Sequence, residues 1–421
     1  MKCCIKQNLL VLLFFLTIPF LFSQNNVAEK PYGENLVIKI ALIGPGDELY
    51  FWWGHIALVI EDKYAGTERF YDYGIFSFES ENFFTNFAMG RLIYSCGVSL
   101  PELNYSIYKR TNRDIILYTL DLMPEKREAV QQFAETNVLP ENRYYFYHHF
   151  NDNCSTRIRD IIDFALDGQF KDRFANTKGR FTFRQHIRRN MWFSPIVDWY
   201  LNFLMGKNID KPITVWEEMF LPAEVALRIE DLRYIDPNGD ERILVTKKEI
   251  LNESVNRHIV LDSPQRLWPK TLIVGLIISG ILIFFLIFNK KILYTINIVL
   301  AILFGFSGLL LFFMTFFTNH DYTYNNINVL FVNPLILIAI PFGVIAIKNK
   351  TPKTKRLFAQ HLVHIVWTYV VLGCIISIII KVFPSFYQEN QAVEALMLPF
   401  SLSLSFIPLW VLKVKGKKRR F

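Results

Sequence analysis

Hydrophobic and polar positions follow two different patterns along the chain, and the change from one to the other falls near residue 270. Up to that point, short apolar segments are interrupted by polar and charged residues. Beyond it, five apolar runs are long enough to cross a hydrocarbon layer of about 30 Å as helices that rise about 1.5 Å per residue. They lie near 271–288, 292–317, 328–347, 362–380 and 393–412. The pattern predicts a globular domain over 24–270 and an all-α, five-helix transmembrane domain over 271–421.

The first half of the globular region predicts β-strands. The segment "HIALVIED" (55–62) alternates, with Ile56, Leu58 and Ile60 on one face and His55, Ala57 and Val59 on the other. Four further segments are rich in aromatic and β-branched residues, as strands are. They read "NLVIKIALIG", "ERFYDYGIF", "RLIYSCGVSL" and "RDIILYTLDL".

Two helices are predicted to follow these strands. The first begins at Pro124, in "PEKREAVQQFAETNVL", because proline suits the first helical position. The second has apolar residues at i, i+3, i+4 and i+7, which indicates one buried face; they are Ile158, Ile161, Ile162 and Ala165. Asp152 and Asn153 are suitable capping residues, so Cys154 falls in the first turn of this helix.

The ends of the chain and the distribution of charge predict the topology. The N-terminus has a basic start (Lys2, Lys6), an apolar core and Ser23 before Gln24, which is typical of a signal peptide over 1–23; an uncleaved anchor is the alternative. Three segments around the apolar runs are basic: the loop at 290–291, "KNKTPKTKR" and the tail "KVKGKKRRF". The positive-inside rule therefore puts the tail in the cytoplasm and residues 24–270 outside it.

The same basic segments hold more positive charge than the whole formal net charge of +8, so the rest of the chain is net acidic. The basic character is thus a signal of membrane topology, and it argues against nucleic acid as a partner.

Cysteine usage leaves two interpretations open for the exported domain. Of five cysteines, only Cys96 and Cys154 lie within it, and an oxidising compartment would allow them to form a disulfide. No CxxC or HExxH motif is present, so we predict neither a metal site nor a cofactor.

The alternative to the disulfide is that Cys154 is a nucleophile. Unpaired N–H groups and the dipole at a helix N-terminus stabilise a thiolate. A thiolate nucleophile needs an imidazole that accepts and returns a proton, and His55, which leads a strand after Gly54, is our first choice. His149 and His148 are alternatives, whereas we expect His186 at the surface among cations.

A third catalytic residue would orient the imidazole, and we assign this role to Asp72 on the next strand. Its alternative role is to cap a turn before Gly74. The amides of Asn151 and Asn153 are candidates to bind a developing oxyanion, although helix capping explains both equally well.

Several segments together resemble a known family, in the order "WWGHIALVIED", "YDYGIFSF", "FAMGRLIYSCG", "NDNCSTRIRD", "GRFTFRQHIR" and "WEEMFLPAEV". With the membrane half, including "FFTNHDYTYNNINVLFVNPL", they resemble the thiol-dependent bacterial lipoprotein N-acyltransferases. The resemblance implies an α+β, circularly permuted papain-like exported domain fused to the five-helix membrane domain. It also implies a cysteine nucleophile, which corresponds to Cys154, and a histidine, which corresponds to His55.

The implied reaction moves an acyl chain from a phospholipid, through a thioester, to the α-amine of the lipidated N-terminal cysteine of a diacylated apolipoprotein. The implied location is the bacterial inner membrane, with several spans and a periplasmic catalytic domain. Candidates to contact substrate are His149, Tyr73, Arg91 and His320 beside the two asparagines. The rival functions are a membrane-anchored cysteine hydrolase, acting on peptidoglycan or lipid esters, and a non-enzymatic module stabilised by the disulfide.

Overall fold

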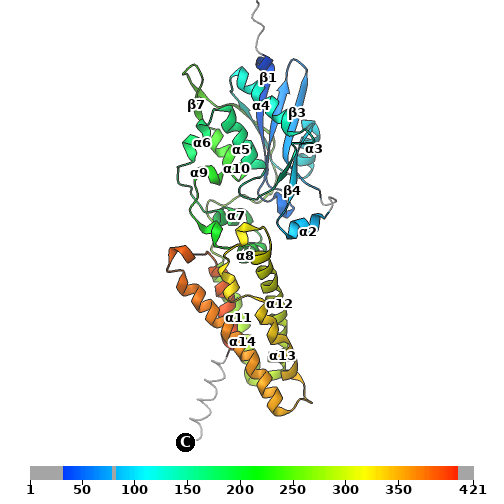
Figure 1. The fold of residues 1–421 in the computed structure, drawn as a ribbon, viewed down its shortest axis with the longest axis vertical. Helices are drawn as coiled ribbons and strands as arrows, with labels where there is room; N and C mark the ends of the chain where they lie inside the picture. Colours follow the sequence, from blue (N-terminus) through cyan, green and yellow to red (C-terminus); the bar gives the residue numbers. More distant parts are fainter. Residues whose placement is uncertain (1–31, 78–81, 406–421) are drawn as a thin grey trace, which may run out of the picture.

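The computed structural model describes residues 32–77 and 82–405, so the predicted signal peptide and the basic tail lie outside the described residues. Figure 1 shows an elongated molecule with a sheet-containing domain at one end and a bundle of long helices at the other. The chain therefore has an α+β domain followed by a helical region, as the pattern of apolar residues predicts. Whether the first domain is a permuted papain-like fold stays a prediction.

The α+β domain contains an antiparallel sheet in the order β6-β4-β3-β2-β1-β5-β9. Its strands are β1 (Leu36–Ile43), β2 (His55–Asp62), β3 (Thr67–Ile75), β4 (Ile93–Ser99), β5 (Ile115–Leu120), β6 (Tyr144–Phe146) and β9 (Val245–Asn252). A separate hairpin pairs β7 (Arg233–Ile235) with β8 (Glu241–Ile243). The five predicted strands are confirmed.

Helices cover both faces of this sheet, which explains why β2 is buried along most of its length. Ile56, Leu58 and Ile60 pack in the main core under α4 (Pro124–Asn137) and α5 (Cys154–Ala165). Ala57 and Val59 pack in a smaller cluster with Tyr108 of α3 (Pro101–Arg110). The alternation in the sequence therefore assigns the two faces correctly, although both are buried.

Further short helices lie in the connections between strands of the α+β domain. They are α2 (Phe83–Ala88), α6 (Gln169–Phe174), α7 (Phe183–Met191), α8 (Pro195–Leu204), α9 (Val215–Glu218) and α10 (Pro222–Ile229). Figure 1 shows α7 and α8 at the junction of the two domains. Phe203 and Leu204, at the end of α8, are buried in the core of the helical domain.

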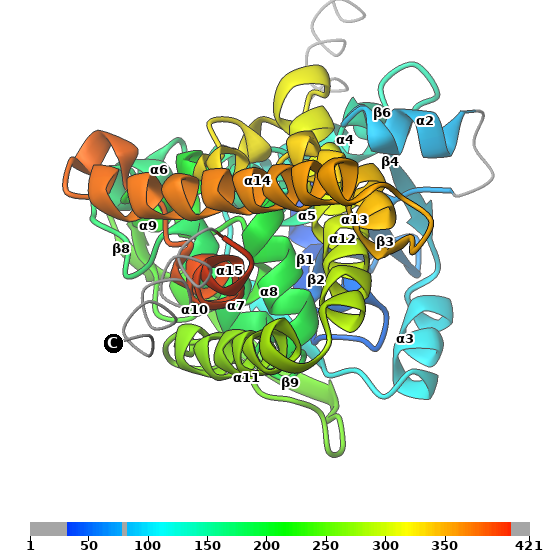
Figure 2. The ribbon, with the colours of Figure 1, turned by 90° about the horizontal axis from the view of Figure 1, so that it is seen from below.

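Within the described part of the chain, four helical segments are apolar and long enough to cross a membrane. They are α11 (Trp268–Phe288), α12 (Lys290–Phe317), the segment Ile327–Ile347 and α14 (Lys353–Ile380). A further apolar helix, α15, is described over Gln391–Leu404, and the remainder of the predicted fifth span lies outside the described residues. In Figure 2, α15 lies between α11 and α14, and it contacts both.

The third of these segments differs from the continuous helix that its hydropathy predicts. It begins as two 3₁₀ turns, Ile327–Leu330 and Pro334–Ile338, before α13 (Ala339–Ile347). Pro334 has no N–H to donate to a regular helix. The Asn333 side chain accepts a hydrogen bond from Leu335 N at 3.0 Å and donates to Val329 O at 2.9 Å. The proline and this capping asparagine divide the span.

A buried arginine holds the junction together. Arg184 of α7 is fully buried, and its guanidinium bonds Asp210 at 2.7 Å and the carbonyls of Met205 and Gly206 at 3.0 and 2.8 Å. The same short segment is bound from the membrane side, since Gly206 N donates to Tyr322 O at 2.8 Å. Arg184 therefore holds the turn after α8, through which the α+β domain contacts the helical domain.

We predict that Arg184→Met destabilises the protein by at least about 3 kcal/mol, because Asp210 is left as a buried, unpaired carboxylate. Denaturant unfolding of the full chain in detergent measures the effect. Arg233→Met is the matched control: its pair with Glu241 is more than half exposed, so the loss should stay below about 1 kcal/mol. Equal effects of the two substitutions would show that Arg184 does not organise the junction.

Candidate active site

Cys154 occupies the first position of α5, and a reciprocal capping box holds it there. Asn153 Oδ1 accepts a hydrogen bond from Thr156 N at 3.0 Å, and Thr156 Oγ1 accepts one from Asn153 N at 2.9 Å. The helix is anchored on the sheet because Ile158, Ile161 and Ile162 are buried in the main core. The thiol itself is free and partly exposed. The predicted placement of Cys154 is thus confirmed.

The amide of Asn153 is engaged in structure rather than turned toward the thiol. Its Nδ2 donates to His149 O at 2.7 Å and to Phe220 O at 3.0 Å. Together with the cap, these bonds occupy the amide donors and its acceptor. Asn151 is exposed, and its backbone N–H donates to His148 Nδ1 at 3.1 Å. The backbone N–H groups of Thr156 and Arg157 donate to Asn153, so those of Cys154 and Ser155 are left in this turn as the local donors for an oxyanion.

His55 and Asp72 lie together where β2 begins and β3 nears its end. His55 Nε2 is 3.0 Å from Asp72 Oδ1 in a contact that is close but not aligned as an ordinary hydrogen bond. Asp72 Oδ1 also accepts a hydrogen bond from Gly74 N at 2.6 Å, so it both closes the turn and contacts the imidazole. Because Nε2 faces the carboxylate, Nδ1 is the ring nitrogen left for a reacting group.

A glycine is needed at position 74 because the His55 imidazole lies very close to its Cα. A Cβ at this position would lie 2.7 Å from His55 Cε1, which is shorter than a tolerable contact. The absent side chain therefore leaves the space that the imidazole occupies. The "YDYG" segment supplies both the carboxylate and the room for the ring.

The electrostatics couple His55, Asp72 and Cys154. Burial opposes a charge on His55, but the nearby Asp72 and Cys154 outweigh it and raise the pKa of His55 well above its usual value. Burial likewise opposes the charge on Asp72, but His55 and the Gly74 N–H lower the pKa of Asp72. An imidazole that interacts with both a thiol and a carboxylate has the arrangement of a cysteine nucleophile, its base and an orienting group.

Arg113 is a residue near this site that the sequence did not single out. It is 1% exposed, its guanidinium lies 4.4 Å from the Phe51 ring centroid, and its Nε donates to Gly44 O at 2.8 Å. Its charge also helps to lower the pKa of Asp72. Arg113 thus anchors the loop that leads into His55. A lone arginine before a strand carries no pattern that would have identified it.

The remaining histidines lie in other environments. Burial and the neighbouring His148 lower the pKa of His149 to about 4, so His149 is neutral at physiological pH. His148 Nε2 is 2.8 Å from Asp321 Oδ1, in the loop after α12. The expected surface position of His186 is wrong: it is fully buried, with Nε2 3.0 Å from Glu218 Oε1, because Glu218 compensates its polarity in the core.

The disulfide interpretation is also wrong for the structure, in which Cys96 and Cys154 are both free. Cys96 is buried beside Tyr73, and burial raises the pKa of the Cys96 thiol to about 12. Tyr73 itself is 1% exposed and belongs to the main core. The structure therefore places Tyr73 behind the site rather than on its surface.

Arg91 and His320 lie near the contact between α2 and the loop that follows α12. Arg91 is exposed beyond the end of α2. His320 is buried, and its ring contacts Phe87 O at 3.0 Å and the Tyr322 hydroxyl at 2.7 Å. His320 thus holds α2 against the loop that follows α12. No three His, Cys, Asp or Glu residues in the described ranges are grouped so that they could hold a metal ion.

Aromatic rings extend from the site to an exposed apolar surface. Tyr147 stacks on Tyr94 with centroids 4.1 Å apart, Tyr94 on Phe76 at 5.0 Å, and Phe76 contacts Tyr50 at 5.5 Å. Tyr94 and Tyr147 both interact electrostatically with Cys154. Beyond Phe76 lies α2, whose Phe84 is 76% exposed. An apolar surface thus reaches from α2 to the neighbourhood of the thiol.

Two family models match the chain. The Lnb N-terminal periplasmic domain matches residues 24–189, and the Lnb transmembrane domain matches residues 264–418. Cys154, His55 and Asp72 lie within the first match, and the described apolar helices lie within the second. Searches among curated proteins and solved structures find no match for the chain.

The raised pKa of His55 predicts a pH dependence of stability. The unfolded pKa is about 6.5, so protonated His55 contributes stability that is fully present below that pH and is lost as pH rises through the higher folded pKa. Asp72→Asn should lower the folded pKa of His55 and weaken this decline. Denaturant unfolding between pH 6 and 9, with the His55 pKa measured by C2 hydrogen exchange, tests both effects.

Asp167→Asn is the control, because Asp167 is an exposed carboxylate that pairs with Lys126 rather than with a histidine. It should leave the pH profile unchanged. An unaltered His55 pKa in Asp72→Asn would contradict the assignment of Asp72 as its electrostatic partner.

Proposed function

We propose that this chain, a membrane protein with the two-domain Lnb architecture and a periplasmic domain, is a Cys-His acyltransferase. It would take an acyl chain from a phospholipid and pass it, through a thioester on Cys154, to the α-amine of a diacylated apolipoprotein. The observation that carries the proposal is the buried His55–Asp72 pair, whose imidazole interacts electrostatically with Cys154, beside a loop bound to the helical domain.

The first half-reaction uses the thiol as nucleophile. His55 accepts the proton of Cys154, and the sulfur attacks the ester carbonyl of the phospholipid. We infer that the backbone N–H groups of Cys154 and Ser155, at the start of α5, stabilise the oxyanion. The carbon–oxygen ester bond then breaks, the lysophospholipid oxygen receives the proton from His55, and the acyl chain remains on Cys154 as a thioester.

The second half-reaction uses the amine of the lipidated N-terminal cysteine. Its nitrogen attacks the thioester carbonyl, the carbon–sulfur bond breaks, and an amide forms. Cys154 departs as a thiolate, which is a good leaving group, while His55 accepts the proton released by the amine and returns it to the sulfur. Asp72 keeps the imidazole oriented through both steps.

The position of the site relative to the apolar helices supports lipid substrates. The loop before Cys154 is bound to the loop after α12 by the His148–Asp321 pair, at 2.8 Å. The exposed face of α2 is fixed to the same loop, because Asn319 N donates to Met89 O at 2.8 Å. We infer that a thiol held beside these loops reaches substrates whose acyl chains stay in the bilayer.

The proposed topology follows from charge and hydropathy. We place the catalytic domain in the periplasm, five spans in the bacterial inner membrane and the basic tail in the cytoplasm. A cysteine hydrolase would use the same Cys154 and His55, with water in place of the amine. The aromatic surface leading to the thiol favours an acyl substrate, and the free thiols oppose the disulfide-stabilised module.

We predict that Cys154→Ala and His55→Ala each reduce N-acylation by at least about a thousandfold, since each removes a group that acts in both half-reactions. Mass spectrometry of lipoprotein N-termini, in cells that rely on this chain alone, measures the third acyl chain. Cys374→Ala is the control, because it removes a buried thiol of α14 and should retain activity. Persistence of the third chain in Cys154→Ala would reject the transferase.

We also predict that Phe84→Ser raises the KM for the phospholipid about tenfold with little change in kcat, because an exposed aromatic anchor beside the site is lost. Steady-state transfer from phospholipid vesicles by the full chain measures both constants. Tyr64→Ser removes a ring that is 81% exposed in the turn between β2 and β3, and it should have no effect. Equal KM values for both variants would show that α2 does not contact lipid.

A further inference from the structure

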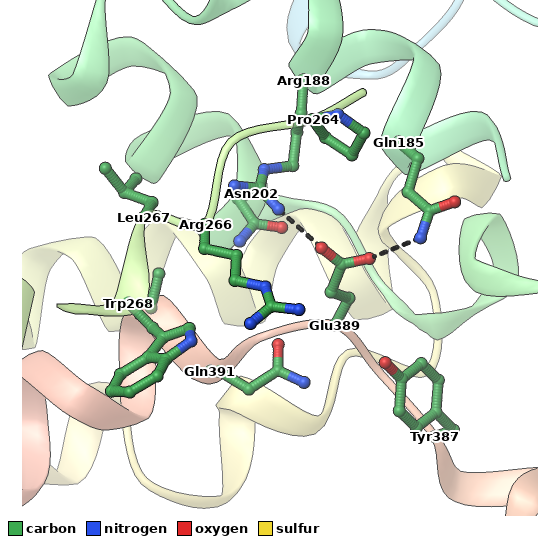
Figure 3. A pocket seen from close by; sticks show the side chains of 11 residues that line it. Gln185, Arg188, Asn202, Pro264, Arg266, Leu267, Trp268, Tyr387, Glu389 and Gln391 are labelled. Atoms are coloured by element: carbon green, nitrogen blue, oxygen red, sulfur yellow. Dashed lines mark hydrogen bonds and ion pairs between the residues drawn. The ribbon is translucent and has the colours of Figure 1, made fainter. Parts of the chain in front are cut away.

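A second feature of the junction is a cavity of about 410 Å³ that lies apart from the catalytic residues. It is lined by residues of α7, α8, the segment that enters α11 and the start of α15 with the loop before it, as Figure 3 shows. The residues that line it are Gln185, Arg188, Asn202, Pro264, Arg266, Leu267, Trp268, Tyr387, Glu389, Gln391 and Ala392. Cys154, His55 and Asp72 are not among them.

The acidic group in the cavity is already satisfied. Glu389 accepts hydrogen bonds from Arg188 Nη1 at 2.6 Å and from Gln185 Nε2 at 3.2 Å. Arg188 is itself committed, with Nε 3.0 Å from Asp198 Oδ1 and Nη2 2.6 Å from Gln265 O. This network forms a rigid wall, and it leaves little carboxylate capacity for a cationic ligand.

Arg266 differs from Arg188 because its guanidinium is exposed and forms no ion pair with any described residue. Figure 3 shows it extending into the cavity between Glu389 and Gln391. The indole of Trp268 lines the same space. The cavity thus presents an uncommitted cation, which a phosphate oxygen matches in charge and in hydrogen-bonding geometry.

Two helices begin at this cavity, and their dipoles reinforce the preference for an anion. α11 starts at Trp268 and α15 at Gln391, and neither has a side chain that caps its N-terminus. In α11, Pro269 has no N–H, and the N–H groups of Lys270 and Thr271 donate to Leu267 O. The positive ends of the two helix dipoles, rather than a set of free N–H donors, therefore add to the field of Arg266.

The position of the cavity indicates where such an anion would come from. Trp268 and Leu267 stand at the start of the first apolar helix, and Tyr387 lies across the cavity from them in Figure 3. Tryptophan and tyrosine favour the level of lipid headgroups. Below this level α11 exposes apolar side chains, including Ile273 and Ile277, each 58% exposed. A phosphate at Arg266 would have acyl chains running along that surface.

We propose that this cavity binds the phosphate of a glycerophospholipid, with Arg266 as its main ligand and the positive ends of the two helix dipoles as electrostatic support. The site is separate from the thiol, and the proposal holds whether or not the chain transfers acyl groups. A lipid held there would join α7 of the α+β domain to the start of α11 and α15.

The test uses the full chain in detergent, as Cys154→Ala so that no turnover consumes the lipid. The probe is dihexanoyl phosphatidylethanolamine below its critical micelle concentration, titrated by calorimetry. We expect Arg266→Gln to raise the Kd about tenfold, which is typical of the loss of one charge-assisted hydrogen bond. Arg266 is exposed and unpaired, so the thermal unfolding of this variant should match that of the parent.

Lys270→Gln is the matched control, because it removes a nearby cation at the start of α11 that does not line the cavity. It should change the Kd by less than twofold. An unchanged Kd in Arg266→Gln, or an equal rise in both variants, would overturn the proposal.

Two further titrations separate a lipid from a free anion. Glycerophosphoethanolamine should compete with the probe, but more weakly, because it carries the phosphate without the acyl chains. Inorganic phosphate should compete more weakly still. If inorganic phosphate displaced the lipid as effectively as the headgroup compound did, the cavity would be a general anion site and the lipid proposal would fail.

Discussion

The capped N-terminus of α5 is the constraint on which the arrangement of the site depends. Asn153 and Thr156 exchange hydrogen bonds across the first turn, and Asn153 also joins this turn to His149 O and Phe220 O. The apolar face of the helix then packs on the sheet. Because one end is bonded and one face is buried, Cys154 has a defined position relative to the start of β2.

The sheet supplies the complementary half of the site through its geometry. His55 begins β2, while Asp72 and Gly74 lie near the end of the antiparallel β3. The imidazole, the carboxylate and the space left by the glycine therefore meet at the same ends of these two strands. Arg113 adds a buried cation behind them and fixes Gly44 in the preceding loop. Several neighbouring groups thus orient the buried pair, which is what the proton transfer proposed for His55 would require.

Hydrogen bonds at the junction join the sheet domain to the apolar helices. From the α+β domain, the Arg184 guanidinium donates a hydrogen bond to the Gly206 carbonyl in the turn after α8. From the helical domain, Asn326 Nδ2 donates to Phe203 O and Leu204 O, both at 3.0 Å. The His148–Asp321 pair ties the same loops to the residues before Cys154. Both the proposed catalytic site and the proposed phosphate site therefore lie along the boundary between the α+β domain and the helical domain.

Local patterns in the sequence predict most of the elements and much of the candidate site. Local periodicity identified β2 and α5, capping chemistry placed Cys154, and "YDYG" carried both Asp72 and Gly74. Hydropathy located the apolar helices because lipid imposes a length on them that is visible in one dimension. The pairing of polar groups, in contrast, is seen only in the folded chain. The burial of His186 with Glu218, the role of Arg113, the division of the third apolar segment and the cavity at Arg266 all depend on partners distant in sequence. The free energy of a polar group depends on what surrounds it after folding, and no local pattern encodes those neighbours.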